Sequence, residues 1–549
     1  MKKERKYIFV VGGVISGVGK GVTTSSVAKI LQSRGLVVTT LKIDPYVNVD
    51  AGTMNPTEHG EVCVLSDGYE TDQDMGNYER FLDITLSRLN YMTTGSVYNK
   101  VISRERNLEY KGKCVQVVPH IPLEVIKQIE EATEKADADV TVVEIGGTVG
   151  EYENILFLEA ARMLKVKNPN NVMFIMVSYL PIPQKVGEMK TKPTQHASRL
   201  LNSTGIQADI IIARSERALD KRRKEKISTF CSIPEENVIS APDVDSIYDI
   251  PLTYEKENVG NIIVKKLGLE KKVKKANLSK WKKFTSKIKT LDEEVHIAII
   301  GKYFDTGDFV LSDAYISVIE SIKFSAYSLG KKPILSWLNA SAFEDENNCK
   351  ELDKYDGVLV PGGFGERAIE GKINVIKYAR ENKIPYFGLC YGMQLLVVEY
   401  ARNVLGLANA NTVEIDAKAE HPVIDVMPDQ KKKIEDQDYG GSMRLGSYPA
   451  VLKKGTIARN SYKKNDITER HRHRYEVNPK YVEQLEKGGL TFSATSPDGV
   501  LMEIAELPIE IHPFFLGTQF HPEFQSRPTS PHPLFTAFVK ASIERGEKK

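Results

Sequence analysis

Short runs of β-branched residues alternate with segments of helical spacing, and this alternation restricts the fold more than any other feature of the sequence. The runs in the first half of the chain are Tyr7–Val11, Val37–Ile43, Asp139–Ile145, Val172–Val177 and Asp209–Ile212. Each run ends in glycine, proline or a charged residue. Strands that alternate with helices in this way form mostly parallel sheets with helices on both faces. We therefore predict an α/β fold.

The alternation stops and then resumes, which divides the chain. From about 268 to 294 the sequence is Lys-dense with few apolar residues, and we interpret it as a solvated helical linker rather than a nucleic-acid-binding patch. A second series follows, with HIAIIGKY, DGVLVPGGFG, IPYFGLCYGMQ and FLGTQFHPEF. A chain of 549 residues is also too long for one core. The predicted domains are 1–267 and 295–549, joined by a linker over 268–294.

Composition excludes several classes of protein. The formal net charge is +2, so neither nucleic acid nor a membrane surface is the default partner. The five cysteines are scattered and form no CxxC pair, which favours a reducing, cytoplasmic compartment. No apolar run reaches the ~18 residues of a membrane span. The basic and apolar N-terminus lacks a small-residue cleavage site, so we interpret it as a first strand rather than a signal peptide.

The first strand runs into a glycine-rich loop with the order of a P-loop. The sequence YIFVV is followed by GGVISGVGKGVTTSS and then by a helical pattern. Glycines let backbone N–H groups turn onto a phosphate, and Lys20 supplies a charge for the outer phosphates. The match departs from the motif because five residues separate Gly13 from Gly19 and because Gly21 stands where Ser or Thr is expected. The alternative is an ordinary tight turn between strand and helix.

Carboxylates and lysines elsewhere in the first half are candidates for the same site. Asp74, in YETDQDMG, and Glu144, at the end of VTVVEIGG, are the predicted Mg²⁺ ligands, since a hard cation prefers oxygen ligands beside phosphates. Lys42 follows another predicted strand and is placed to reach the phosphates, although an exposed lysine is the alternative. The loop GEMKTKPTQH carries Lys190 and Lys192 and suits a second polyphosphate; its alternative is a plain surface loop.

The second half carries the parts of a thiol hydrolase. Cys390 lies between an apolar strand and a helical pattern, where small flanking residues permit a strained turn that presents the thiol at a helix N-terminus. Gly363 and its neighbours offer backbone N–H groups for an oxyanion. His521 follows another strand, and Glu523 comes two residues later to orient the imidazole. We predict Cys390, His521 and Glu523 as a catalytic triad.

These motifs resemble two known families. The second half is similar to the class I glutamine amidotransferases, through PGGFGER, GLCYGMQ and QFHPEF. The first half resembles the synthetase domain of the CTP synthase family, through GGVISGVGKG, KIDPYVNVDAGTMNPTEHGEV, DGYETDQDMGNYERF, VQVVPHI, VEIGGTVGEYE, GEMKTKPTQH and DVDSIY. GGSMRLG and ERHRHRYEVN match that family as well, so nearly the whole chain is covered.

The resemblance implies a P-loop, Rossmann-like synthetase domain and a flavodoxin-like class I glutaminase domain. It implies that ATP phosphorylates O4 of UTP and that ammonia from glutamine displaces the phosphate to give CTP, the last step of de novo pyrimidine nucleotide synthesis, with an internal passage between the two sites. It also implies feedback inhibition by CTP, activation by GTP, and a homotetramer that in some members stacks into filaments.

Carried over by position, the resemblance assigns residues to each ligand. Glutamine would be held by Gly363, Tyr391, Gly392, Met393, Gln394, Glu414 and Arg474, with Glu414 on its ammonium group. UTP or CTP would be held by Ser16, Lys190, Thr191, Lys192, Pro193, Thr194, Gln195 and Lys226. ATP would be held by Gly17, Val18, Gly19, Lys20, Gly21, Val22, Asp74 and Val244. The inhibitory cytidine would be recognised by Glu151, Tyr152 and Glu153.

Two departures and two alternatives accompany the resemblance. Ala241-Pro242 precedes Val244 where many relatives carry a lysine, and the segment around 304–312 is longer than usual. One alternative is another ATP-dependent amidotransferase that activates a carboxylate. The other is a filament-forming or regulatory protein with a silent glutaminase. The intact triad argues against silence, and KTKPTQ argues for a nucleoside triphosphate acceptor.

Overall fold

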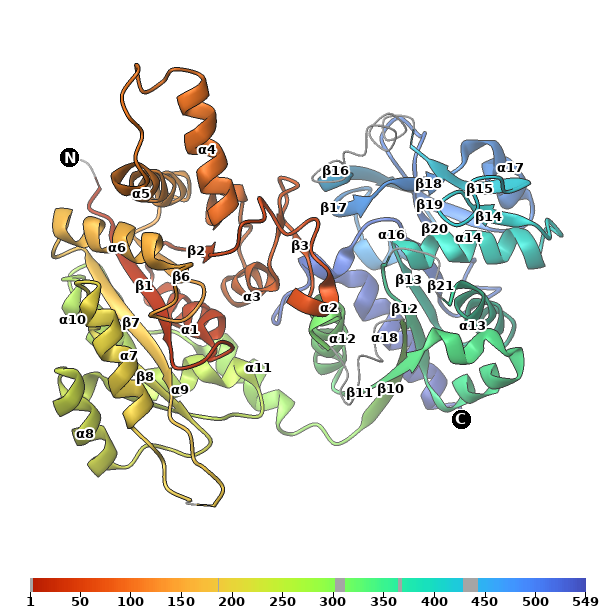
Figure 1. Ribbon diagram of the computed structural model, residues 1–549. Helices are drawn as coiled ribbons and strands as arrows, with labels where there is room; N and C mark the ends of the chain where they lie inside the picture. The colour runs from red at the N-terminus through yellow and green to blue at the C-terminus, as the bar shows by residue number, and fades with distance from the viewer. Residues whose placement is uncertain (1–2, 186, 302–311, 364–367, 428–442) are drawn as a thin grey trace. The chain divides into compact units, whose positions relative to one another are not determined.

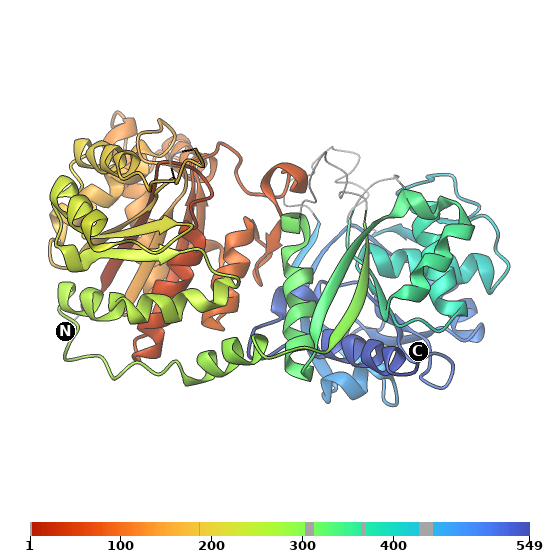
Figure 2. The same ribbon diagram turned by 90° about the horizontal axis from the view of Figure 1, so that it is seen from below.

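The computed structural model describes residues 3–185, 187–301, 312–363, 368–427 and 443–549. The chain forms two compact units. Unit 1 comprises residues 1–50 and 77–285, and unit 2 comprises residues 51–76 and 286–549. Both units are built on a sheet with helices on each face (Figures 1 and 2), and the predicted α/β class is confirmed.

Unit 1 contains a seven-stranded sheet in which every neighbouring pair is parallel. Its strand order is β5-β2-β6-β1-β7-β8-β9. The strands are β1 (Lys6–Gly13), β2 (Val38–Asp44), β5 (Tyr91–Thr93), β6 (Val140–Ile145), β7 (Val172–Tyr179), β8 (Ile210–Ser215) and β9 (Val238–Pro242). All five runs predicted in this half are strands. The glycine-loop strand β1 lies in the middle of the sheet, where its carboxyl end is flanked on both sides.

Two apolar cores cover the two faces of this sheet because successive side chains of a strand point to opposite faces. On β1, Phe9 packs into one core and Val10 into the other. The helices that cover the faces include α1 (Lys20–Ser33), α5 (Val117–Lys135), α6 (Ile155–Lys167), α7 (Lys192–Ser203), α8 (Lys221–Cys231), α9 (Ile250–Lys256) and α10 (Val259–Lys266). Further helices are α3 (Gln73–Leu82), η1 (Arg88–Asn90), α4 (Thr94–Arg106), η2 (Glu235–Asn237) and η3 (Ile247–Asp249).

Unit 2 is built on a nine-stranded sheet of order β11-β10-β12-β13-β21-β20-β19-β16-β17, parallel from β11 to β21 and antiparallel beyond. These strands are β10 (Glu294–Gly301), β11 (Lys332–Asn339), β12 (Gly357–Val360), β13 (Tyr386–Leu389), β16 (Arg444–Leu452), β17 (Asp466–His473), β19 (Thr491–Thr495), β20 (Met502–Glu506) and β21 (Phe515–Thr518). A smaller sheet joins β14 (Ala410–Thr412), β15 (His421–Val426) and β18 (Tyr475–Val477). The predicted strands of the second half are all present.

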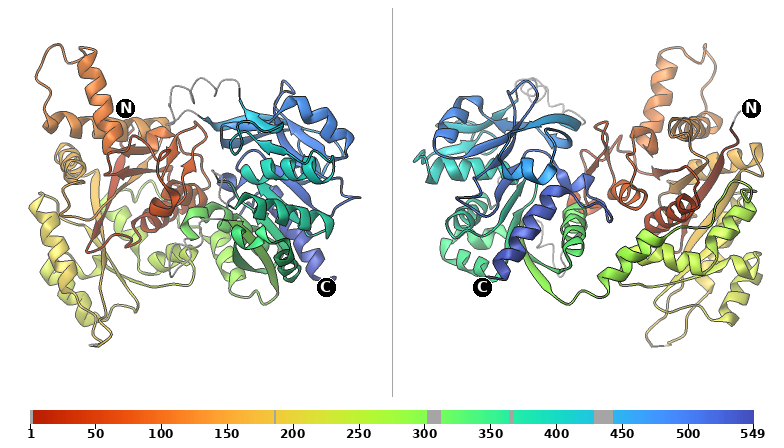
Figure 3. Two further views of the ribbon diagram at one scale, coloured as in Figure 1. Left: turned by 45° about the vertical axis from the view of Figure 1, so that its right-hand side comes forward. Right: turned by 180° about the vertical axis from the view of Figure 1, so that it is seen from behind.

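Helices cover both faces of the nine-stranded sheet. The helices α12 (Ile316–Leu329) and α18 (Pro533–Gly546) pack side by side on one face (Figure 3), and α13 (Ile369–Glu381) and α14 (Tyr391–Asn403) pack on the other. The remaining helices of this unit are α2 (Pro56–His59), η4 (Ser312–Tyr315), η5 (Ala340–Glu344), η6 (Glu346–Lys354), α16 (Ile457–Tyr462), α17 (Pro479–Lys487) and η7 (Pro522–Gln525).

The observed units differ from the predicted boundaries in one main respect, since residues 51–76 belong to unit 2. This segment carries the small hairpin β3 (Cys63–Val64) and β4 (Glu70–Thr71). The Glu61 carboxylate accepts hydrogen bonds from the backbone N–H of Ser317, at 3.1 Å, and from its hydroxyl. The side chain of Phe524 packs with those of Cys63 and Val64. Contacts so distant in sequence left no local pattern from which to predict them.

The Lys-rich linker forms a helix with one buried face rather than a fully solvated one. Helix α11 (Ser279–Ile288) places the Trp281 ring among Phe81, Tyr248 and Phe284. The Trp281 indole N–H donates to the Tyr248 carbonyl at 2.7 Å. One aromatic anchor therefore fixes a helix whose other residues are mostly polar.

Candidate active sites

Cys390 occupies the strained turn that its flanking sequence predicts. It follows β13 and is the N-cap of α14, with φ 48° and ψ −96°. A positive φ is uncommon for a residue other than glycine and marks a backbone held by its surroundings. The Cys390 N–H donates to the Thr518 carbonyl of β21 at 2.6 Å. The Cys390 Sγ lies 3.8 Å from the Arg472 carbonyl and 3.7 Å from the Gln519 side-chain amide, so the turn is held by β17 and by the end of β21.

His521 and Glu523 form a buried pair beside the thiol. The His521 Nδ1 lies 2.7 Å from Glu523 Oε1. Burial opposes protonation, but the charges of Glu523 and Cys390 raise the pKa of His521 to about 10. The ring stacks on Phe524, with ring centroids 5.3 Å apart. His521 therefore keeps its proton through neutral pH and can return it to a leaving group.

The loop that follows β12 lies against both catalytic side chains. A Cβ atom on Gly362 would come 2.9 Å from His521 Cε1 and 3.7 Å from Cys390 Cβ, so a larger residue there would displace the imidazole. Gly363 lines the same space. The motif PGGFGER continues through 364–367, which lie outside the described residues, as do 440–442 of GGSMRLG and most of the longer segment 304–312.

A cavity of about 580 Å³ opens beside Cys390, His521 and Glu523, and the described residues that line it all belong to unit 2. Cys390, His521 and Glu523 line it together with Glu414 and Arg474, the two predicted recognition side chains. A carboxylate and a guanidinium in one cavity suit a ligand that carries both an ammonium group and a carboxylate. The predicted triad and the predicted amino-acid contacts are thus brought to one place.

The side chains of residues 391–394 do not reach this cavity. The Tyr391 ring is buried and lies 5.3 Å from the Lys372 ammonium group. A Cβ on Gly392 would collide with the Val360 carbonyl, at 2.4 Å. Met393 is fully buried, and Gln394 Nε2 donates to the Tyr475 carbonyl at 3.0 Å. A contact of these four residues with substrate would therefore use backbone groups.

Several residues at this site were not predicted. Residues 52–54 and 61–62 line the cavity from a segment distant in sequence. The Arg472 guanidinium is held by Glu70 Oε1 at 2.8 Å and by the Gly52 carbonyl at 3.3 Å. Gln519 is separated from His521 by one residue, and its amide faces the thiol. The motif ERHRHRYEVN marked the region of Arg472, but no sequence pattern indicated its partner Glu70.

The glycine loop of unit 1 has the backbone of a phosphate cradle. Positive φ angles occur at Val14, Gly17 and Gly19, and no side chain caps the first turn of α1. The Lys20 side chain folds back over the end of β1, because a Cβ on Gly12 would lie 2.9 Å from Lys20 Nζ. Ser16 and Gly17 are exposed at the tip of the loop, Val18 and Gly21 are buried, and Val22 is half-buried. The predicted lysine thus lies at the carboxyl end of the central strand.

Lys42 and Glu144 lie together on neighbouring strands. Lys42 Nζ is 2.9 Å from Glu144 Oε1 and 3.6 Å from Asp44 Oδ1, and the Tyr78 hydroxyl donates to Glu144 Oε2. Lys42 is therefore buried in an ion pair instead of exposed. Asp74 lies in the first turn of α3, where its N–H donates to Asp72. Among the described residues, no three His, Cys, Asp or Glu side chains gather as a metal-binding cluster.

The loop at 190–195 leads into α7 beside a second cavity. This cavity, of about 380 Å³, is lined by Lys192 and Pro193 at the start of α7 and by Val14, Thr148 and Val149. Thr191, Thr194 and Gln195 are buried, with Gln195 Nε2 donating to Thr191 Oγ1 at 3.1 Å, and Lys190 pairs with Glu188 at 2.7 Å. Lys226 is exposed on α8. The structure thus brings part of the predicted polyphosphate loop next to the glycine loop.

Two further predicted groups border these loops. The Glu151 carboxylate accepts from the Thr148 N–H at 2.8 Å, whereas Tyr152 and Glu153 are exposed. Val244 packs against the core that includes Val18. The neighbouring Asp243 pairs with Arg214 at 2.7 Å, and a Cβ on Gly19 would lie 2.7 Å from the same guanidinium. Arg214 was not predicted, and it connects the region of Val244 to the glycine loop.

No helix among the described residues is both long and apolar enough to cross a membrane.

Comparisons with known proteins cover the whole chain. The family model for the CTP synthase N-terminus matches residues 6–269, and the model for class I glutamine amidotransferases matches residues 310–541. CTP synthases of Staphylococcus aureus strains JH9 and Newman are each 48% identical over 545 residues, which is 99% of this chain and 100% of theirs.

Among solved structures, the glutaminase domain of Trypanosoma brucei CTPS with bound acivicin is 37% identical, with a TM-score of 0.42, and covers 46% of this chain and 94% of that one. A glutamine amido transferase from Methylobacillus flagellatus is 12% identical, with a TM-score of 0.26, over 47% of this chain and 95% of that one.

Proposed function

The chain belongs to the CTP synthase family, and from this we propose which of its residues carry out each part of the reaction. The enzyme is a glutamine-hydrolysing ligase that uses ATP, UTP and glutamine to form CTP. The observation that carries the residue assignment is the cavity of unit 2, where Cys390, His521 and Glu523 meet Glu414 and Arg474.

Glutamine hydrolysis begins at the thiol. His521 holds the proton of the Cys390 thiol as an imidazolium, and the thiolate attacks the side-chain amide carbon of glutamine. The resulting oxyanion is stabilised by backbone N–H groups of the loop at Gly363 and of the turn at Cys390. The intermediate collapses as the C–N bond breaks and His521 returns its proton to the nitrogen, so that ammonia leaves. His521 then deprotonates a water molecule, which attacks the thioester; glutamate leaves and the thiol is restored.

Charge complementarity orients the substrate for this attack. The Glu414 carboxylate suits the α-ammonium group of glutamine, and the Arg474 guanidinium suits its α-carboxylate. Both groups line the cavity with the triad, so a glutamine held by its backbone end can extend its side-chain amide toward Cys390. A buried carboxylate–imidazole contact at Glu523 fixes the imidazole for both proton transfers.

Unit 1 would phosphorylate O4 of UTP, because a carbonyl oxygen leaves poorly until it is phosphorylated. We assign the ATP phosphates to the loop from Gly17 to Val22 with Lys20, and Val244 to the ATP site. Carboxylates and phosphate oxygens are the ligands that Mg²⁺ prefers, so we assign the ion to Asp74 and Glu144; when bound, it would neutralise the phosphates. Lys42 pairs with Glu144 and lies beside the same site. Ammonia then attacks C4 of the ring, phosphate leaves, and CTP forms.

We assign the UTP or CTP triphosphate to the loop from Lys190 to Gln195 together with Ser16 and Lys226. The cavity beside Lys192 and Pro193 supports this assignment. Glu151, Tyr152 and Glu153 would recognise the cytidine of CTP as feedback inhibitor. We further propose activation by GTP, a homotetramer with the capacity for filaments, an internal ammonia passage and a cytoplasmic location, the last from the scattered free cysteines.

The test is to incubate the protein with UTP, ATP and Mg²⁺, supplied with either glutamine or ammonium, and to follow conversion of the uracil ring to cytosine. CTP formation with both nitrogen sources, and glutamate release only with glutamine, is the expected result. Formation of CTP from ammonium but not from glutamine would refute the glutaminase assignment, and no CTP from either source would refute the synthetase assignment.

A further inference from the structure

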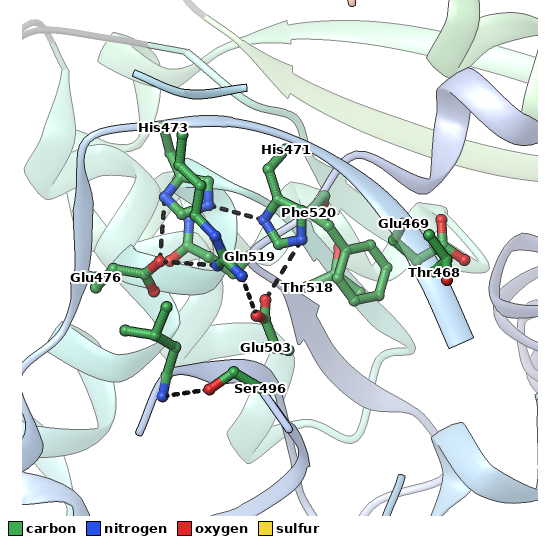
Figure 4. Close-up of polar contacts among 12 residues, drawn as sticks. Thr468, Glu469, His471, His473, Glu476, Ser496, Glu503, Thr518, Gln519 and Phe520 are labelled. Atoms are coloured by element: carbon green, nitrogen blue, oxygen red, sulfur yellow. Dashed lines mark hydrogen bonds and ion pairs between the residues drawn. The ribbon is translucent and has the colours of Figure 1, made fainter. Parts of the chain in front are cut away.

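Five ionisable side chains close a ring in the interior of unit 2, and Figure 4 labels four of them, His471, His473, Glu476 and Glu503. The fifth, Arg444 of β16, donates to Glu503 Oε1 at 2.8 Å and to Glu476 Oε1 at 3.2 Å. His473 Nε2 lies 2.9 Å from His471 Nδ1. The outer nitrogens of the two imidazoles face the two carboxyls, His473 Nδ1 at 3.5 Å from Glu476 and His471 Nε2 at 3.6 Å from Glu503. All five side chains are buried.

With neutral imidazoles, the charges in this ring balance if the two carboxyls share one proton. Arg444 supplies one positive charge, and two ionised carboxylates would leave a buried net negative charge, which is costly. Burial raises the pKa of Glu476 and Glu503 and lowers the pKa of His471 and His473. Neutral histidines, one carboxylate and one carboxyl group therefore accompany Arg444. Each carboxyl also has one oxygen that accepts no hydrogen bond from the described part of the chain, which leaves room for that proton.

Among the described residues, the surroundings of the ring supply no further uncompensated charge. The Tyr448 ring lies 4.5 Å from the Arg444 guanidinium carbon and packs edge-on against His471. The charge of His521 also lowers the pKa of His471 and His473, but this charge is balanced by the carboxylate of Glu523. The charge of Asp498 raises the pKa of Glu503, but Asp498 lies in an exposed turn where solvent screens its charge.

The ring lies directly behind the residues that line the glutamine cavity. Along the end of β17 and the start of β18, Arg472, Arg474 and Tyr475 line the cavity, whereas His473 and Glu476 belong to the ring. Alternation along a strand separates Arg472 from His473 in this way. Displacement of the ring would therefore displace the cavity wall.

Hydrogen bonds connect the ring to the nucleophile. His473 Nδ1 lies 3.2 Å from the Tyr475 carbonyl, which accepts from Gln394 Nε2 at 3.0 Å. Gln394 Nε2 also lies 3.4 Å from Gln519 Oε1, and Gln519 Nε2 donates to Cys390 Sγ at 3.7 Å. The path from an imidazole of the ring to the thiol thus crosses one carbonyl and two side-chain amides.

We propose that Arg444, His471, His473, Glu476 and Glu503 are positioning residues of the glutaminase, acting as one electrically neutral ring that holds the end of β17 against the Cys390 turn. None of the five contacts the reacting atoms. The inference rests on the proposed role of Cys390 as the nucleophile. Glutamine hydrolysis therefore requires the ring as a whole to carry no net charge. Substitutions that keep the shape of a side chain and change only its charge test this requirement without disturbing the packing.

The test replaces glutamate by glutamine, which has the shape of a protonated glutamate and cannot carry its negative charge. Glu476→Gln and Glu503→Gln each leave one carboxylate opposite Arg444, so kcat/KM for glutamine hydrolysis should stay within about threefold of the parent enzyme. The double variant leaves the buried guanidinium without a counter-ion, and kcat/KM should fall at least about tenfold. Adding Arg444→Met to the double variant removes that charge and should restore kcat/KM to within about threefold of the parent.

Ammonium-dependent CTP formation, measured on each preparation of the full-length enzyme, should change by less than about twofold. Asp498→Asn is the matched control, since it makes the same charge change outside the ring and should leave glutamine hydrolysis unchanged. Equal effects of the single and double variants, or a double variant that only multiplies the two single effects, would overturn the inference. A triple variant whose kcat/KM for glutamine is no higher than that of the double variant would also overturn the inference. If the double variant does not fold, the triple variant decides the question. Absence of glutaminase activity in the parent enzyme would instead refute the proposed function.

Discussion

Glu523→Gln separates the charge of the triad carboxylate from its shape. Glutamine keeps an oxygen that can accept the hydrogen bond now 2.7 Å from His521 Nδ1, so the imidazole keeps its orientation. The negative charge is lost, and this charge is the strongest influence that raises the pKa of His521 against burial. The variant therefore tests whether the imidazolium must be stabilised.

The size of the effect follows from the buried contact. A hydrogen bond to a charged group is worth about 1.5 to 3 kcal/mol, against about 0.5 to 1.5 kcal/mol for a neutral one. Loss of the charge alone therefore costs about 1 to 1.5 kcal/mol, which corresponds to a loss of about 5- to 12-fold in kcat/KM for glutamine. The pH dependence should change as well. Because the pKa of His521 is raised to about 10, the parent imidazolium loses its proton only as pH rises through that value. Without the Glu523 charge this pKa falls, so the alkaline limb of glutamine hydrolysis should move to lower pH.

The assay is glutamate release as a function of pH, together with ammonium-dependent CTP formation, which should be unchanged. Glu469→Gln provides the matched control, since Glu469 pairs with His532 at 3.0 Å in another buried carboxylate–imidazole contact of the same unit. That variant should change thermal stability but not the alkaline limb. Glutamine hydrolysis within twofold of the parent in Glu523→Gln, with an unmoved alkaline limb, would refute the reasoning.

Three further substitutions test the remaining assignments. Cys390→Ala should abolish glutamine-dependent CTP formation and leave the ammonium-dependent reaction intact, because the thiol acts only in releasing ammonia; loss of both in a folded variant would contradict this. Lys20→Ala should eliminate CTP formation from either nitrogen source, because the phosphates lose their clamp; near-normal turnover would mean that the loop is only a turn. Glu153→Ala should raise the CTP inhibition constant about tenfold at fixed UTP, as expected for the loss of a charge-assisted hydrogen bond of about 1.5 kcal/mol; a constant within twofold of the parent would place the contact elsewhere.

Features with a local sequence pattern could be predicted from the sequence. Buried parallel strands are continuous apolar runs, and β1, β6 and β7 are found within one or two residues of their predicted ends. The turn at Cys390 was also predicted, because a strand, small residues and a helical pattern follow one another there. Such signals depend on neighbours a few positions apart, so the fold class and the turn at Cys390 could be predicted without long-range information.

Features made by distant residues could not be predicted. Glu61 and Ser317 are 256 positions apart, and Glu70 and Arg472 are 402 positions apart, so no periodicity connects them. The ring of Arg444, His471, His473, Glu476 and Glu503 could not be predicted for another reason. The end of β17 is almost entirely charged, and a strand without apolar alternation resembles a solvated edge. Only the fold shows that Glu476 and Glu503 bury the imidazoles of this strand.

The two faces of β17 explain why residues 51–76 belong to the glutaminase unit. Arg470 donates to the Val64 carbonyl at 3.1 Å, and Arg472 is anchored by Glu70, whose side chain is 1% exposed. The carbonyl of the same Arg472 faces the Cys390 thiol. One face of the strand thus depends on the segment from the first half of the chain, and the other depends on the ring. Because the Cys390 thiol lies beside the end of this strand, the proposed glutaminase site requires both halves of the sequence, even though the side chains proposed as catalytic all come from one.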